Sequence, residues 1–237
     1  MEKHRQLAQS KPWQQDVHYF KKVTISSLAL MKMAIHAESG NEIEVMGLIL
    51  GYCKENEFVV KDVFRAPVEG TETRVNAGND AVEYMVQYCE DMDDMLMIGW
   101  YHSHPGYGCW LSGIDVETQK LNQDFHHTWV ALVIDPYKTK AQQRVEIGAF
   151  RTYPSDYSND RQMQMNVRND KVEDFGVHMH KYYPLEIELE CDTLDKQVFD
   201  IISNDNWRSI LSTQFVFHYL YRIQNTLLII YQISISN

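Results

Sequence analysis

The sequence predicts a protein of the α/β or α+β class, in which helices cover a central β-sheet. Short apolar segments rich in β-branched and aromatic residues recur along the chain and are typical of buried strands. Segments with apolar residues three to four positions apart alternate with them and are typical of helices. With 237 residues, 44% of them hydrophobic and 23% charged, the chain suits one large domain, or one domain plus an appendage, with a sizeable core.

Each element has its own signal. The first expected helix covers residues 24–38, because Ser26 or Ser27 can cap it and Gly40 follows as a stop. The expected strands are, in chain order, residues 44–52, 58–68, 95–101, 128–134, 145–153 and 182–190. Further helices are expected over residues 81–92, from 112 to about 126, and over 194–211, and a polar surface excursion is expected over 154–174.

The charge and the cysteines exclude several classes of protein. A formal net charge of −11 argues against a general binder of nucleic acid or anionic membranes, since both need a basic face. Much of the acidity lies between Glu69 and Leu96, where eight acidic residues accompany one arginine. Cys53, Cys89, Cys109 and Cys191 lie far apart without a CxxC pair. Reduced thiols in an intracellular protein are therefore expected.

Neither end of the sequence predicts a targeting or membrane segment. Residues 1–15 are polar and mixed in charge, unlike a secretory signal. Residues 213–237 are apolar, but Arg222 interrupts them and the clean run over 227–231 is far shorter than the roughly 20 residues of a membrane helix. A tail-anchored membrane protein stays open as an alternative that rests on this tail alone.

The segment from Tyr101 to Asp115, YHSHPGYGCWLSGID, carries the chemistry. His102 and His104 stand two apart at the end of an expected strand, so both imidazoles project from one face. Asp115 follows in the first turn of the next helix, and a tight glycine-rich return can bring its carboxylate back to the histidines. Two histidines and one carboxylate leave a fourth tetrahedral position open, which is typical of catalytic rather than structural zinc.

A structural reading of the same residues is also open. A histidine pair can decorate a strand end, and Ser112-x-x-Asp115 matches a helix capping box with Asp in place of Glu. The two readings are compatible, because one serine can cap the helix and still face a metal. Cys109 and Trp110 can simply pack the turn, and Glu44 can be a solvated residue at a strand edge. The HExxH, HxE…PCxxC and phosphate-loop patterns are absent from the sequence, which disfavours those metalloproteases, deaminases and nucleotide enzymes.

Taken together, these residues resemble the JAMM motif of the MPN-domain metallo-isopeptidases: an upstream Glu44, His102-x-His104, seven residues, Ser112, two residues, and Asp115. The resemblance implies an MPN domain with a central mixed β-sheet flanked by helices, like the cytidine deaminases. It implies that His102, His104 and Asp115 hold one catalytic Zn²⁺, that Glu44 is the general acid/base, and that Ser112 donates to the oxyanion. Cys109 and Trp110 would lie near the site.

Longer strings, such as APVEGTETRVNA at 66–77 and EDFGVH at 173–178, resemble the signalosome branch of the family. That branch removes a ubiquitin-like modifier from cullins, the scaffold subunits of ubiquitin ligases. The resemblance implies a heterodimer with a sister MPN subunit, further signalosome subunits as partners, neddylated cullin as substrate, and a location in cytoplasm and nucleus. No direct binding of nucleic acid or membrane is expected. A deubiquitinase of the proteasome-lid type and a non-catalytic MPN scaffold stay as alternatives.

The expected organisation follows from this resemblance. Residues 1–22 form an N-terminal arm, 23–155 the catalytic core with an acidic insertion at 69–96, and 156–212 a second insertion and the rest of the domain. Residues 213–237 form an atypical apolar tail, where the family has C-terminal helices, and this tail is expected to impair assembly. The acidic insertion is expected to gate the site, with Glu72 and Arg74 contributing. A plain solvated loop is the alternative.

Overall fold

The computed structural model describes residues 6–66 except 8, residues 95–154 except 143, residue 157, residues 172–191, and residues 193 and 195. The chain divides into two compact units, residues 1–190 and residues 191–237, and every element given below belongs to the first. Glu72, Arg74 and most of the acidic insertion lie outside the described residues. So do most of the second insertion, the expected helices at 81–92 and 194–211, and the apolar tail.

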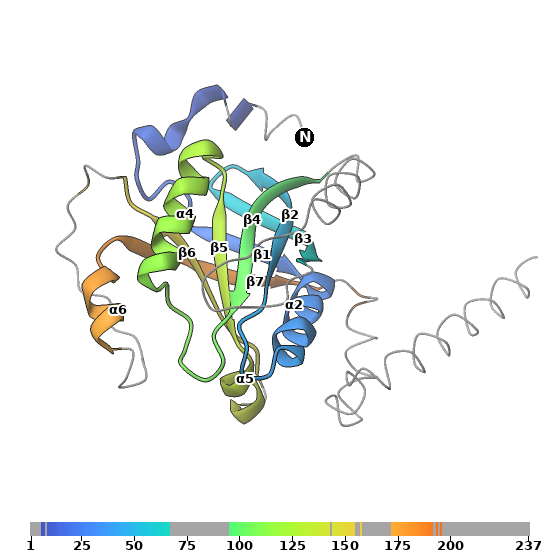
Figure 1. Ribbon diagram of the computed structural model, residues 1–237. Helices are drawn as coiled ribbons and strands as arrows, with labels where there is room; N and C mark the ends of the chain where they lie inside the picture. Colours follow the sequence, from blue (N-terminus) through green and yellow to red (C-terminus); the bar gives the residue numbers. More distant parts are fainter. Residues whose placement is uncertain are drawn as a thin grey trace, which may run out of the picture. The chain divides into compact units, whose positions relative to one another are not determined.

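The described residues form one mixed sheet and several helices (Figure 1). The strands are β1 (Lys22–Ser26), β2 (Met46–Lys54), β3 (Glu57–Arg65), β4 (Leu96–Ser103), β5 (Val130–Asp135), β6 (Glu146–Thr152) and β7 (Tyr182–Glu190). The helices are a 3-10 turn η1 (Pro12–Gln14), α2 (Ser27–Ser39), α4 (Gly113–Phe125), α5 (Pro136–Gln142) and α6 (Val172–His178). None of the helices in this part of the chain combines the length and apolar character that crossing a bilayer requires.

The sheet runs in the order β1-β3-β2-β4-β5-β6-β7 and mixes parallel with antiparallel neighbours. The pairs β1–β3, β4–β5 and β1–β7 are parallel, and the other neighbours are antiparallel. Because β1 pairs with both β3 and β7, the sheet closes on itself, which the sequence did not predict. The predicted class, a mixed sheet with helices packed on it, is confirmed.

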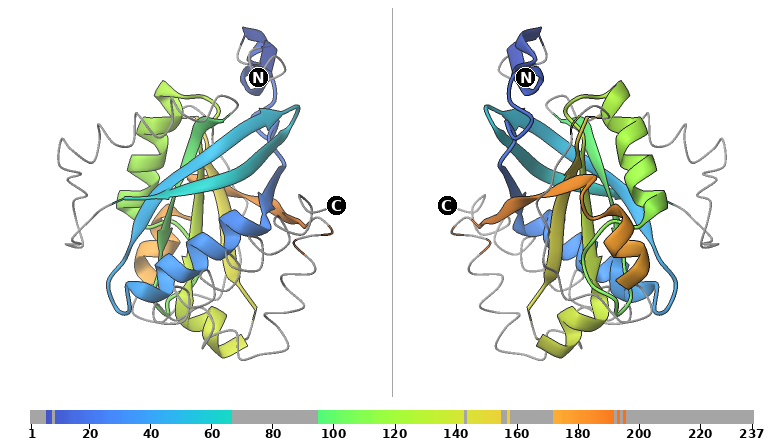
Figure 2. Two further views of the ribbon diagram at one scale, coloured as in Figure 1. Left: turned by 90° about the vertical axis from the view of Figure 1, so that its right-hand side faces the viewer. Right: turned by 90° about the vertical axis from the view of Figure 1, so that its left-hand side faces the viewer.

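The two faces of the sheet have separate hydrophobic cores, and one helix covers each (Figure 2). Helix α2 packs Ala29, Met33 and Ala37 into the larger core. Helix α4 packs Val116 into the smaller core, which also holds Trp100 and Trp129. Strand β5 is buried along its whole length and alternates between the two cores, which explains why it reads as a continuous apolar run.

Most expected elements are found within two residues of their predicted limits, but the helix expected at 24–38 starts three residues later and the strand expected at 58–68 ends three residues earlier. The predicted helix at 24–38 starts only at Ser27, because the β-branched run before it forms β1 between β3 and β7. Ser26 caps α2 as predicted, its hydroxyl accepting a hydrogen bond from Ala29 N–H at 3.2 Å. The short helices α5 and α6 and the turn η1 were not predicted, since elements of at most seven residues carry little periodic signal.

Candidate metal centre

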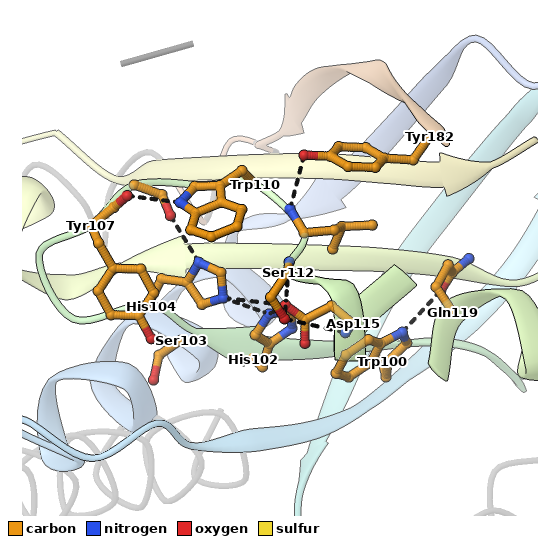
Figure 3. Close-up of polar contacts among 12 residues, drawn as sticks. Trp100, His102, Ser103, His104, Tyr107, Trp110, Ser112, Asp115, Gln119 and Tyr182 are labelled. Atoms are coloured by element: carbon orange, nitrogen blue, oxygen red, sulfur yellow. Dashed lines mark hydrogen bonds and ion pairs between the residues drawn. The ribbon is translucent and has the colours of Figure 1, made fainter. Parts of the chain in front are cut away.

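His102, His104 and Asp115 converge at one point, as their spacing predicts (Figure 3). Asp115 Oδ2 lies 3.4 Å from His102 Nε2 and 3.5 Å from His104 Nε2. The two Nε2 atoms lie 3.0 Å apart. Zinc–ligand bonds of about 2.0 Å place neighbouring ligand atoms of a tetrahedral site about 3.3 Å apart. The three atoms therefore fit three corners of a zinc tetrahedron.

Each ligand reaches this point through a different piece of backbone. His102 is the second-last residue of β4, and His104 follows the strand while its N–H still bonds the carbonyl of Ile134 on β5 at 2.9 Å. The alternation of a strand therefore continues to His104 and points both rings to one face. Asp115 lies in the first turn of α4, which begins at the cap residue Ser112.

The capping box and the metal site are one structure. Ser112 Oγ accepts from Asp115 N–H at 3.3 Å, and Asp115 Oδ2 accepts from Ser112 N–H at 2.8 Å and from Ser112 Oγ at 2.7 Å. The same Oδ2 faces the histidines. The cap fixes the carboxylate rotamer, so the helix start aims the third ligand. The capping reading of the Ser112–Asp115 pair is confirmed, and the same geometry leaves Asp115 Oδ2 able to serve as a metal ligand.

The electrostatics favour an ionised Asp115. Burial alone raises the pKa of this carboxyl group, because it disfavours the charged form. The nearby imidazoles of His102 and His104 outweigh burial and hold the pKa of Asp115 well below its ordinary value. A carboxylate that stays charged at neutral pH is the form that binds a metal ion.

The two imidazoles are held in different ways. Trp100 stacks on the ring of His102, with centroids 4.5 Å apart and planes 13° apart, while His102 Nδ1 has no hydrogen-bond partner among the described residues. His104 Nδ1 lies 3.0 Å from the carbonyl of Gly108, and the ring of Tyr107 lies over it at 4.5 Å. Since that carbonyl only accepts, Nδ1 carries a proton, so that Nε2 is the nitrogen that offers its lone pair when the neutral ring binds a metal.

Strand pairing brings the segment that carries Glu44 alongside the end of β4. Met46 of β2 is opposite His102 of β4 in an antiparallel ladder, and Ser103 N–H continues it by donating to the Val45 carbonyl at 2.9 Å. If the same register is extended by one residue, Glu44 comes opposite His104. Glu44 is exposed to solvent, as a residue that meets a substrate must be.

The two residues expected near the site differ in their surroundings. The Trp110 ring packs edge-on to His104 at 5.5 Å, and its Nε1–H donates to the Tyr107 carbonyl at 2.8 Å. Cys109 instead turns its thiol to the Glu146 carbonyl of β6 at 3.4 Å. Burial raises the pKa of this thiol, so it is uncharged at neutral pH and a poor fourth ligand.

Four residues that support the cluster were not predicted as site residues: Trp100, Ser103, Gln119 and Asp135. Gln119 on α4 accepts from Trp100 Nε1–H at 2.9 Å, although the two residues are far apart in sequence. Trp100 and His102 stand two apart on β4 and therefore share one face of the strand. That spacing was the only sign in the sequence that Trp100 lies near the site.

Comparison with known proteins agrees with this geometry. The family model described as "JAB1/Mov34/MPN/PAD-1 ubiquitin protease" matches residues 18–128. The chain is 48% identical over 223 residues to COP9 signalosome complex subunit 5 of Dictyostelium discoideum, covering 91% of this chain and 67% of that protein. The chain belongs to the JAB1/Mov34/MPN/PAD-1 family. The matched span includes Glu44, both histidines, Ser112 and Asp115, so the predicted family is confirmed.

Other relatives in the JAB1/Mov34/MPN/PAD-1 family carry the same name. Identity is 53% over 210 residues to COP9 signalosome complex subunit 5 of Debaryomyces hansenii, with 85% of this chain and 45% of that protein covered. It is 50% over 214 residues to the protein of that name from Oryza sativa, with 87% and 59% covered. The chain thus spans between about half and two thirds of the lengths of these relatives.

Proposed function

We propose that this chain is a zinc-dependent isopeptidase that removes a ubiquitin-like modifier from cullins, as the catalytic subunit of a signalosome complex. The observation that carries the proposal is the convergence of His102, His104 and Asp115 on one point, in a chain about half identical to COP9 signalosome subunits 5. The zinc, the substrate and the complex are parts of this proposal.

The residues have separate tasks. His102, His104 and Asp115 hold the ion, which when bound supplies a Lewis acid that activates water at neutral pH. Glu44 accepts the proton of the attacking water and passes it to the departing lysine amine, since amine loss needs a proton donor. Ser112 supplies a hydroxyl at the cluster, 2.7 Å from Asp115 Oδ2, and turns it toward the oxyanion when substrate is bound.

The non-catalytic scaffold alternative lacks support from the site. A scaffold has no need to keep three ligand atoms at tetrahedral spacing with an ionised carboxylate among them. A deubiquitinase of the proteasome-lid type would use the same cluster, so the cluster cannot separate the two modifiers. The names of the relatives favour the signalosome branch.

The partners and the location belong to the proposal as well. We expect a sister MPN subunit, further signalosome subunits, and a distribution over cytoplasm and nucleus. Among the described residues, Cys53, Cys109 and Cys191 form no disulfide, which suits a reducing compartment. We also infer that the acidic insertion with Glu72 and Arg74 gates the site. Charge neutralisation from Glu69 to Glu83 tests the gate, and unchanged turnover both alone and in the complex would refute it.

The decisive experiment measures bound zinc and cleavage of neddylated cullin, with ubiquitin chains as comparator. The assay contains the wild type or His104→Ala together with reconstituted partner subunits, since an isolated subunit can be gated shut. We expect zinc and cleavage of the cullin conjugate in the wild type and neither in the variant. Zinc-free wild type, cleavage that survives the substitution, or preferred cleavage of ubiquitin chains would contradict the proposal. Co-purification with the partners reports whether this chain assembles.

A further inference from the structure

We propose that Asp135 is a positioning residue for the metal ligand His104. Asp135 ends β5, belongs to neither the ligand set nor the catalytic pair, and is completely buried. It acts through the backbone of the loop at 105–110, whose Gly108 carbonyl meets the His104 ring. The inference deepens the proposed function and rests on it for the identity of the metal.

The carboxylate of Asp135 is compensated by backbone N–H groups. Its Oδ1 accepts from Gly106 at 3.0 Å, Tyr137 at 3.0 Å and Lys138 at 2.9 Å, and its Oδ2 accepts from Gly108 at 2.8 Å. A buried carboxylate is costly unless it is hydrogen-bonded, and four donors meet that cost here.

The bonds from Gly106 and Gly108 hold the loop at 105–110, whose backbone has two residues with positive φ. Gly106 has φ +86° and Gly108 has φ +93°, a region that favours glycine. The loop leaves β4 immediately after the ligand His104 and returns to the cap residue Ser112. Its conformation therefore decides where both ends of the cluster lie.

Asp135 reaches the proposed metal ligand His104 through Gly108, which bonds to both residues. Gly108 gives its N–H to Asp135 Oδ2 at 2.8 Å, and its carbonyl accepts from His104 Nδ1 at 3.0 Å. The chain Asp135–Gly108–His104 thus fixes the proton on Nδ1 and the direction of Nε2. Partners of this kind typically change metal affinity 10- to 100-fold when they are removed.

A purely structural role for Asp135 would need fewer of these bonds. Capping α5 requires only Oδ1, which accepts from Tyr137 and Lys138. Oδ2 serves Gly108 alone and contributes nothing to the helix. Asp135→Asn separates the two roles, because one amide oxygen still caps α5 while the amino group presents a donor to Gly108 N–H.

The test measures zinc affinity by competition with a chromogenic chelator, together with the visible spectrum of the Co²⁺-loaded protein. We expect Asp135→Asn to bind zinc at least tenfold more weakly and to alter the Co²⁺ spectrum. Asp62→Asn is the matched control, because Asp62 on β3 is also buried but bonds Val63 N–H and Lys32. The control is expected to lose stability and keep zinc affinity within twofold.

A second variant keeps the test decisive if Asp135→Asn does not fold. Gly108→Ala leaves Asp135 in place but strains the backbone at φ +93°, which displaces the carbonyl that His104 uses. We expect the same loss of zinc affinity. Wild-type affinity in both variants, or in Gly108→Ala alone when the other is unfolded, would overturn the positioning role. A wild type that binds zinc tightly but cleaves no conjugate refutes the proposed function and leaves this inference standing.

Discussion

Ser103 is bonded twice to Val45, the residue that follows the proposed general base. Its hydroxyl accepts from Val45 N–H at 2.9 Å, and its own N–H donates to the Val45 carbonyl at 2.9 Å. Ser103 is fully buried between the ligands His102 and His104. One side chain therefore ties the strand that carries the histidines to the segment that carries Glu44.

Ser103→Ala is expected to lower turnover of the conjugate at least tenfold without weakening zinc binding, because Glu44 loses its fixed position. The unfolding free energy falls by about 1–2 kcal/mol, since Val45 N–H loses its acceptor. Steady-state kinetics in the reconstituted complex provide kcat and KM, and Ser103→Thr restores kcat by keeping the hydroxyl. Ser27→Ala is the control, because Ser27 is buried and donates to the Glu190 carbonyl at 2.9 Å. Wild-type kcat in Ser103→Ala would disprove the link.

Asp115→Asn is expected to reduce bound zinc from about one ion per chain to almost none. The change removes the charge of the ligand whose low pKa keeps it ionised, and it retains the size of the side chain. Elemental analysis after dialysis measures the metal. Glu117→Gln is the control, because Glu117 is an exposed carboxylate on the same helix. Equal zinc in the two variants would show that Asp115 is not a ligand.

Stability is expected to fall with acid because of His36. Burial, followed by the positive charge of Arg65, lowers the pKa of His36 to about 4, and its Nδ1 pairs with the Tyr101 hydroxyl at 2.7 Å. The folded state therefore binds fewer protons than the unfolded state between about pH 6.5 and 4. The stability that neutral His36 contributes is therefore fully present above this window and is lost as the pH falls through it.

One such histidine changes the unfolding free energy by at most about 1.4 kcal/mol per pH unit. Denaturant unfolding of the metal-free protein at pH 7.0, 6.0 and 5.0 measures how the unfolding free energy changes with pH. These values span the upper part of the window and about one unit around it. His36→Gln removes this contribution and is expected to flatten the curve. A curve of the same steepness in the variant would assign the acid sensitivity to other groups.

Gln119→Leu is expected to destabilise the fold by roughly 2 kcal/mol or more. Gln119 is fully buried, accepts from Trp100 Nε1–H at 2.9 Å and donates to the Trp129 carbonyl at 3.2 Å. Leucine leaves Trp100 Nε1–H buried without its acceptor and removes one of two donors to the Trp129 carbonyl, which still accepts from Arg151 Nη1 at 2.6 Å. Chemical denaturation measures the loss, and Glu117→Leu on the exposed face of α4 is expected to stay within about 0.5 kcal/mol. An equal effect in the two variants would show that the buried bonds are unimportant.

The sequence by itself determined the class of fold, most of the strands, and the three candidate ligands His102, His104 and Asp115. It could do so because these features depend on local periodicity. A strand alternates with period two, and a serine three residues before an aspartate caps a helix, whatever the rest of the chain does.

Only the tertiary structure decided what surrounds the ligands. Asp135 is 31 residues from His104 in sequence, yet parallel pairing of β4 with β5 brings them together. Val45 meets Ser103 in the same way through antiparallel pairing of β2 with β4. Local sequence carries no signal for such contacts, because a strand's partner and register depend on how the whole sheet closes and buries its two faces.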